Sequence, residues 1–125
     1  MKRILISVAA AAAIFVLAPS AATAGDAAAG KPVFEANCMS CHGATGKGDG
    51  PVGAVLQPPP RDFSVGDFKY DADKNGTPGE DADIKMVIQQ GAGAFGGSPL
   101  MAPWGGMIED GDVDNLVAYI RSLKR

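Results

Sequence analysis

Two cysteines and the single histidine of the chain stand together in the sequence Cys38-Met39-Ser40-Cys41-His42. Cysteines three positions apart lie on one side of a helical turn, where both thiols can reach the two vinyl groups on one edge of a haem and form thioethers. The adjacent histidine is then carried under the ring, with a side-chain nitrogen available for the iron. The spacing therefore predicts one covalently attached haem c, with Cys38 and Cys41 as its anchors and His42 as an axial iron ligand.

Three other uses of this cysteine pair are weaker. A thioredoxin-like redox pair needs a βαβ context, and the sequence contains no clear strand pattern. A zinc site needs four ligands, so a carboxylate would have to complete the two cysteines and one histidine that the chain offers. A plain disulfide stays open for an exported chain, but export is also the setting in which c-type haem is attached.

An iron held by one histidine needs a second axial ligand or keeps an open position, and the chain has no second histidine. Methionine is the usual partner in electron-carrying cytochromes. Met101 is the candidate, because two prolines hold its segment extended and nearby glycines allow close approach to a flat ring. Met107 is the next choice, although it leads into the last helix and is expected to pack there. Met39 lies within the attachment turn, and Met86 lies beside the apolar face of a helix.

The first 24 residues have the three-part pattern of a secretory signal peptide. Lys2 and Arg3 precede an uncharged run over residues 4–18, and Ala22-Thr23-Ala24 offers small residues at the cleavage point. The run is shorter than the roughly 18 residues of a spanning helix, which makes an uncleaved anchor the weaker interpretation. We expect cleavage after Ala24, a periplasmic location, no stable membrane insertion and a single domain over residues 25–125.

Length and charge exclude several classes of protein. A chain of 125 residues excludes doubly wound dinucleotide-binding enzymes and β/α barrels. The net charge is −3, and it becomes −5 without Lys2 and Arg3, which argues against a nucleic-acid partner. Over residues 25–125 the 17 glycines and 8 prolines make up about a quarter of the chain, which approaches the share found in low-complexity chains. A small domain of this composition needs a group that organises its core.

Hydrophobic periodicity predicts an all-α fold of three or four short helices joined by long Gly/Pro-rich loops. A regular first helix is expected only from about residue 31. Pro32 suits the first position of such a helix, and it would kink a helix that begins at Asp26.

Two later helices and one short turn are also expected. Thr77 is the candidate N-cap of the second helix, and Glu80 would complete a Thr-x-x-Glu capping box. The last helix is expected over about residues 110–124, where apolar residues recur every three or four positions. A short helix is expected at residues 52–56, within the glycine-rich stretch.

These pieces resemble the class I c-type cytochromes, particularly the small bacterial monohaem carriers. The similarity covers nearly all of the chain after residue 24, in four segments: residues 30–38 leading into the haem motif, 48–51, 101–106 and 116–121. The resemblance implies the cytochrome c fold, a helical shell around one haem whose first and last helices cross.

The resemblance also implies particular contacts. Gly30 and Phe34 match the family's first-helix contact, and Leu116 and Tyr119 match its last-helix contact. Pro51 matches the proline whose carbonyl accepts the N–H of the axial histidine, a bond that fixes the tautomer and raises the basicity of the ligand.

The expected function is one-electron transfer by a monomeric carrier, not an enzyme. Redox partner proteins are expected to dock transiently at an exposed haem edge near Gly43 and residues 92–97, at a surface of small residues. Two alternatives stay open. The chain could be an electron-entry subunit of a larger oxidoreductase complex, or a ligand-binding or sensor protein whose sixth position is open because Met101 does not bind.

Other motifs have weaker chemical interpretations. Residues 91–96 spell Gly-x-Gly-x-x-Gly, but the motif follows a helix rather than a strand. Residues 71–76 spell the first half of a calcium-binding loop, yet Ala82 stands where the bidentate Glu belongs, so a solvated turn is preferred over calcium at residues 71–82. Arg61 and Trp104 could contact haem propionates, or could serve as a surface salt bridge and a core contact.

Overall fold

The computed structural model describes residues 25–125, so the predicted signal segment lies outside the described residues. Within that range the chain is helical and contains no strand, which confirms the predicted all-α fold. The α-helices are α1 (Ala27–Asn37), α2 (Met39–His42), α3 (Asp81–Gln90) and α4 (Asp110–Ser122), and the 3₁₀ turns are η1 (Gly53–Val55), η2 (Phe63–Val65) and η3 (Ala92–Phe95). The turn η1 confirms the short helix expected at residues 52–56. Among the helices so described, none is long and apolar enough to cross a membrane.

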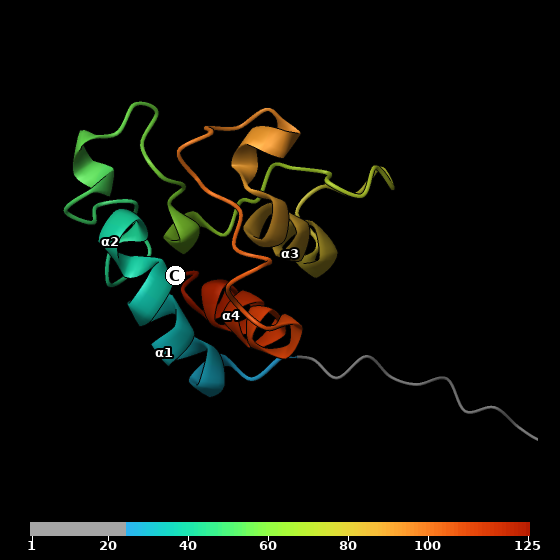
Figure 1. Ribbon diagram of the computed structural model, residues 1–125, viewed down its shortest axis with the longest axis horizontal. Helices are drawn as coiled ribbons and strands as arrows, with labels where there is room; N and C mark the ends of the chain where they lie inside the picture. The colour runs from blue at the N-terminus through green and yellow to red at the C-terminus, as the bar shows by residue number, and fades with distance from the viewer. Residues whose placement is uncertain (1–24) are drawn as a thin grey trace, which may run out of the picture.

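The packing of α1 against α4 forms the centre of the fold, with α3 lying over α4 (Figure 1). Gly30 makes the close approach possible, because a Cβ at this position would collide with the main-chain carbonyl of Asn115. The fully buried Phe34 then packs with its ring centroid 5.2 Å from that of Tyr119. This confirms the contact between the first and last helices that the resemblance implied.

The remaining core comes from the apolar stripe of α4 and from its neighbours. Its buried members are Val113, Leu116, Val117 and Ile120 of α4, Ile84 and Ile88 of α3, and Ile108. Full burial of each such side chain contributes about 1.5–3 kcal/mol relative to exposure. The stripe predicted for the last helix is therefore the surface that joins α1 and α3.

The predicted start of the first helix was wrong, since α1 begins at Ala27 and contains Pro32 in its interior. Asp26 caps the helix, because its side chain accepts hydrogen bonds from the N–H groups of Ala28 (2.8 Å) and Ala29. Pro32 removes the hydrogen bond to the carbonyl four residues earlier, that of Ala28. Both residues are exposed, so water can satisfy that carbonyl and the cost of the proline is small.

The predicted cap of the second helix was also wrong. α3 begins at Asp81 with Glu80 as its N-cap, and Asp83 completes the capping box by accepting the Glu80 N–H at 2.9 Å. Thr77 belongs to the preceding turn, where its N–H donates to Asn75. The capping box is formed by Glu80 and Asp83, three residues after the predicted pair. The buried Asp83 carboxylate accepts hydrogen bonds from the preceding turn as well as from the start of the helix.

Candidate functional site

The segment Cys38–Gly43 follows α1 directly and forms a single helical turn. Cys38 donates its N–H to the Phe34 carbonyl at 2.8 Å, and His42 donates to the Cys38 carbonyl at 2.8 Å. The thiols of Cys38 and Cys41 are free and half-buried. Burial, reinforced by the neighbouring Cys41, raises the pKa of the Cys38 thiol to about 11, so Cys38 is a neutral thiol at neutral pH.

A glycine-rich loop over residues 43–53 folds back on this turn and satisfies its carbonyls. Gly48 donates to the His42 carbonyl at 2.8 Å, and Val52 donates to the Ser40 carbonyl at 2.9 Å. A Cβ at Gly53 would collide with the Cys41 carbonyl, so this approach requires glycine. The loop therefore holds both cysteines and the histidine in one rigid turn.

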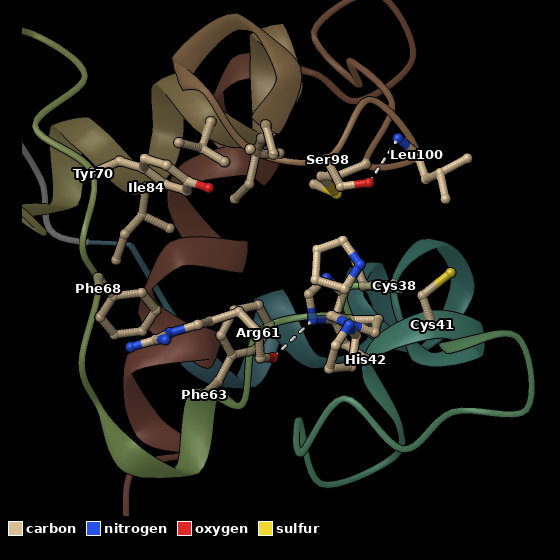
Figure 2. A pocket seen from close by; sticks show the side chains of 18 of the residues that line it. Cys38, Cys41, His42, Arg61, Phe63, Phe68, Tyr70, Ile84, Ser98 and Leu100 are labelled. Carbon is tan, nitrogen blue, oxygen red and sulfur yellow. Dashed lines mark hydrogen bonds between the residues drawn. The ribbon is translucent and has the colours of Figure 1, made fainter. Parts of the chain in front are cut away.

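A mainly apolar cavity of about 920 Å³ lies against this turn. Figure 2 shows Cys38, His42, Arg61 and Phe63 along one side of the cavity, and Ser98 with Leu100 on the other. The volume lies at the upper end of the range for sites that enclose large organic ligands. The four predicted site residues, Cys38, Cys41, His42 and Met101, all line the cavity.

Of the two ring nitrogens of His42, Nδ1 is hydrogen-bonded to the main chain, which leaves Nε2 for a metal. Its Nδ1 lies 3.2 Å from the carbonyl oxygen of Arg61, which fixes Nδ1–H as the donor. Burial lowers the pKa of His42, and the Arg61 hydrogen bond opposes this only in part. The imidazole is therefore neutral at neutral pH, with a lone pair on Nε2, which is the form that binds a metal.

Arg61 takes the place that the resemblance gave to Pro51 as the acceptor for His42, so that expectation was wrong. Pro51 is exposed and lies in the loop whose N–H groups bond to α2. The N–H groups of that loop donate to the carbonyls of the Cys38–Gly43 turn, which holds the loop away from Nδ1 of His42. The segment after the three prolines therefore approaches the imidazole instead.

Met101 is the one methionine of the described residues that lines the cavity. Its main chain is held at both ends: Met101 donates its N–H to the Ser98 carbonyl, and its carbonyl accepts from Ala92, both at 3.2 Å. Met107 is 68 % exposed, so the expectation that it packs was wrong. The turn from Trp104 to Ile108 directs the buried Ile108 inward, and Met107 is left outward.

Sequence reasoning did not identify the aromatic surroundings of His42. The Phe63 ring stacks on the imidazole with centroids 4.4 Å apart and planes 16° apart. Phe68 in turn stacks on Phe63, at 5.9 Å. The signal was the run of aromatic residues at 63, 68 and 70 in a segment without helical or strand periodicity. Arg61 forms an ion pair with Asp67, and Trp104 lines the cavity.

Residues 71–83 hold an acidic group whose polar atoms serve the fold. Asp71, Asp73 and Asp83 place carboxylate oxygens within 4.8 Å of one another. The Asp83 oxygens already accept main-chain N–H groups, from Ala72 at 2.6 Å and from Glu80 at 2.9 Å. The arrangement is that of a turn tied to the start of α3.

Comparisons with known proteins agree with this architecture. A family model described as "Cytochrome c" matches residues 27–124. The cytochrome c-554(547) of Halothiobacillus neapolitanus is 38 % identical over 105 residues, which cover 81 % of this chain and 100 % of that protein. The cytochrome c6 of a Picosynechococcus strain is 31 % identical over 99 residues, 79 % of this chain and 74 % of its own length. The solved Kuenenia stuttgartiensis reducing HAO-like protein complex contains a chain that superimposes with a TM-score of 0.62 at 31 % identity, over 77 % of this chain and 41 % of that one.

Proposed function

This chain belongs to the cytochrome c family, whose members carry covalently attached haem c and take part in electron transport, and from that premise we propose a specific role for it. It is a periplasmic, monomeric monohaem carrier that passes single electrons between redox partner proteins. Cys38 and Cys41 form the two thioethers, and His42 and Met101 are the axial ligands of the iron. The protein catalyses no bond chemistry.

One observation carries the proposal: the four side chains line one cavity, three of them on one turn and Met101 on the 98–101 segment. Ser98 and Leu100 of that segment lie across the cavity from His42 (Figure 2). The residues suit haem c, since two free thiols three residues apart can form its two thioether bonds, and a neutral imidazole and a methionine sulfur are usual axial ligands of its iron. When bound, the haem supplies an iron that alternates between the ferrous and ferric states. The chain anchors that group twice, presents Nε2 of His42 to it and surrounds it with apolar walls that exclude water.

The surface at residues 96–100 supports partner docking. Gly96 and Gly97 line the cavity, and Leu100 lines it while 60 % exposed. Small residues and one exposed apolar side chain suit a small, transient interface. Gly43 is buried and does not line the cavity, so we place docking on the 96–100 side alone. The acidic net charge favours a partner with a positive patch, with an association rate that falls as salt rises.

The test uses protein purified after expression of the whole sequence, including its N-terminal segment. Intact mass is expected to equal the chain from Gly25 plus one haem that survives acid extraction. The ferric spectrum is expected to show an iron–sulfur charge-transfer band, and carbon monoxide is expected to bind the reduced protein slowly. Haem lost in acid acetone overturns the Cys38 and Cys41 assignments, and rapid carbon monoxide binding overturns the closed His/Met site.

A second candidate is a haem subunit held permanently in a larger oxidoreductase. The observation that favours it is the structural match to one chain of a complex, in which the matched part is 41 % of that chain. Stoichiometric co-purification of a larger enzyme from the native periplasm would favour this role. Recovery of the protein alone supports the free carrier.

A further inference from the structure

The segment Arg61–Asp67 makes two independent contacts with His42. The Arg61 carbonyl lies 3.2 Å from Nδ1, and the Phe63 ring stacks on the imidazole face at 4.4 Å. The hydrogen bond fixes the direction in which Nδ1 points, and the stacked Phe63 ring fixes the plane of the imidazole. Figure 2 shows Arg61, Phe63 and His42 together on one side of the cavity.

The same segment is closed by its own hydrogen bonds. The Arg61 guanidinium donates from Nε to the Asp67 carbonyl at 2.8 Å, and it also pairs with the Asp67 carboxylate at 2.6 Å. Isolated surface ion pairs contribute little, but this arginine bonds to the main chain as well and so ties the two ends of the segment together. Between them, Asp62 caps η2 and Gly66 closes it in the left-handed conformation, with φ of 70°.

The segment is also attached to the rest of the site. Phe63 donates its N–H to the Gly46 carbonyl at 2.7 Å, which ties it to the loop behind α2. Its ring packs edge-on to the buried Phe34, with centroids 6.4 Å apart, and so reaches the α1–α4 core. The position of the Phe63 ring over His42 is therefore set by the fold and not by His42 itself.

We propose that residues 61–67 form a clamp that sets the orientation of the His42 imidazole, with Arg61 and Phe63 as positioning residues for the iron ligand. The main-chain acceptor holds the proton on Nδ1 and makes Nε2 a stronger donor to iron. The stacked ring holds the imidazole plane in one rotational position. The Arg61–Asp67 pair keeps the clamp closed, because it fixes the main chain that carries the acceptor. This inference rests on the proposed ligation of iron by His42.

The first experiment follows the Nδ1 proton of His42 by NMR in the reduced holoprotein. Arg61→Ala is expected to speed its exchange with solvent at least about tenfold, because the acceptor main chain loses its closing contacts. Arg61→Lys keeps a charge opposite Asp67 but not the two-nitrogen contact, so an intermediate exchange rate is expected. Asp67→Asn keeps the carbonyl acceptor, so the smallest increase is expected. Exchange at the wild-type rate in all three variants overturns the role of Arg61, and if Arg61→Ala does not load haem, the other two variants decide.

The second experiment separates positioning from packing at Phe63. Phe63→Leu is expected to change the electron paramagnetic resonance g-values of the oxidised protein, because these depend on the plane of the axial imidazole. The matched control is Tyr119→Leu, which removes another ring packed on Phe34 but does not line the cavity. The control is expected to lower the melting temperature and leave the g-values unchanged. Equal g-values in wild type and Phe63→Leu would show that Phe63 only packs.

The wild-type oxidised protein distinguishes this inference from the proposed function. Large hyperfine shifts of the His42 ring protons establish the ligand on which the clamp acts. Unshifted ring protons overturn the His42 ligation, and the clamp with it. Shifted protons combined with unchanged variants overturn the clamp alone.

Discussion

The two sides of the cavity hold their proposed iron ligands in different ways. His42 is fixed by a helical turn, a hydrogen bond at Nδ1 and a stacked aromatic ring. The main chain of Met101 is fixed by hydrogen bonds with Ala92 and Ser98. Its thioether cannot donate a hydrogen bond and is only a weak acceptor, so hydrogen bonding does little to orient the side chain. The histidine side is therefore determined several times over, whereas the methionine side depends on how its loop packs. Loss of the histidine itself should therefore destroy the site, whereas changes on the methionine side should retune it.

The largest effect is expected for His42→Ala. This substitution removes the proposed ligand, which the turn, the 43–53 loop and the 61–67 segment position, and the chain has no second histidine. We expect a yield of haem-loaded protein on the order of a tenth of wild type or less, since the two cysteines alone leave the iron unligated on this side. Haem staining and absorption of whole-cell extracts measure the yield. Wild-type yield and spectrum would show that the two sides do not differ as described.

Met101→Ala is expected to keep the haem and change its properties. The charge-transfer band should disappear, carbon monoxide should bind rapidly, and the reduction potential should fall by on the order of 0.1 V, a fraction of the about 0.8 V range that axial ligands set. Potentiometric titration and carbon monoxide mixing provide the measurements. Met107→Ala, at the exposed methionine six positions later, is the control and should behave as wild type.

Two glycines compare the sides directly, because they adopt nearly the same backbone conformation. Gly43 follows His42 with φ 79° and ψ 158°, and Gly91 ends α3 with φ 80° and ψ 152°. An alanine in this region costs about 1–3 kcal/mol of stability at either position. At Gly91 the new Cβ would also lie 2.8 Å from the Met101 carbonyl, which is main chain and cannot move aside.

Gly91→Ala should therefore weaken the charge-transfer band, whereas Gly43→Ala should lower the melting temperature and leave the band intact. At Gly43 the new Cβ meets the Asp49 side chain, which can rotate away. Gly76→Ala is the control, because Gly76 also has a positive φ of 91° but faces open space. A band weakened equally by all three substitutions would contradict the assignment of this effect to the Met101 loop.

The smallest effect is expected from Asp83, which anchors the turn before α3. Burial acts to raise the pKa of its carboxyl, but the N–H groups of Asp73, Glu80 and Ala72 outweigh burial and hold the pKa below its usual value. A lowered pKa means that stability is present above the ordinary value of about 3.9 and is lost as the pH falls through the lowered one. Asp83→Asn should be less stable at pH 7, and its free energy of unfolding should decline less steeply in acid.

Urea unfolding at neutral pH and between about pH 5 and 2, a span that brackets the ordinary carboxyl pKa, measures this difference. Asp112→Asn, an exposed carboxylate in the first turn of α4, serves as the control. Parallel acid profiles for wild type and Asp83→Asn would show that the N–H contacts do not stabilise the ionised carboxylate.

The sequence predicted well what depends on residues close together in the chain. Cys38, Cys41 and His42 share one turn, so their spacing alone placed them together, and the stripe of the last helix followed from its period. Met101 was reached by elimination among the methionines, and it does line the cavity. These features need no knowledge of how distant segments pack.

The errors arose where distant segments decide the structure. Pro32 is tolerated in α1 because the carbonyl it orphans faces solvent, which periodicity does not reveal. The carbonyl of Arg61, and not that of Pro51, accepts the hydrogen bond of His42, because the loop that carries Pro51 is hydrogen-bonded to α2. The stacking of Phe63 on His42 joins residues in a stretch without any regular pattern, and only the folded chain brings them together.

The contact between α1 and α4 also bears on how the chain reaches its fold. It joins residues at opposite ends of the described chain, and the hydrogen bond from Asp26 to Asn115 spans 89 positions. The chain loses the entropy of closing this long loop before it gains the free energy of burying Phe34. Folding is therefore slower than in bundles whose contacting helices are neighbours in sequence. Any nascent or clipped polypeptide that lacks residues 110–122 leaves the apolar face of α1 uncovered. The buried side of α1, Phe34 included, is therefore covered only after residues 110–122 have been synthesised.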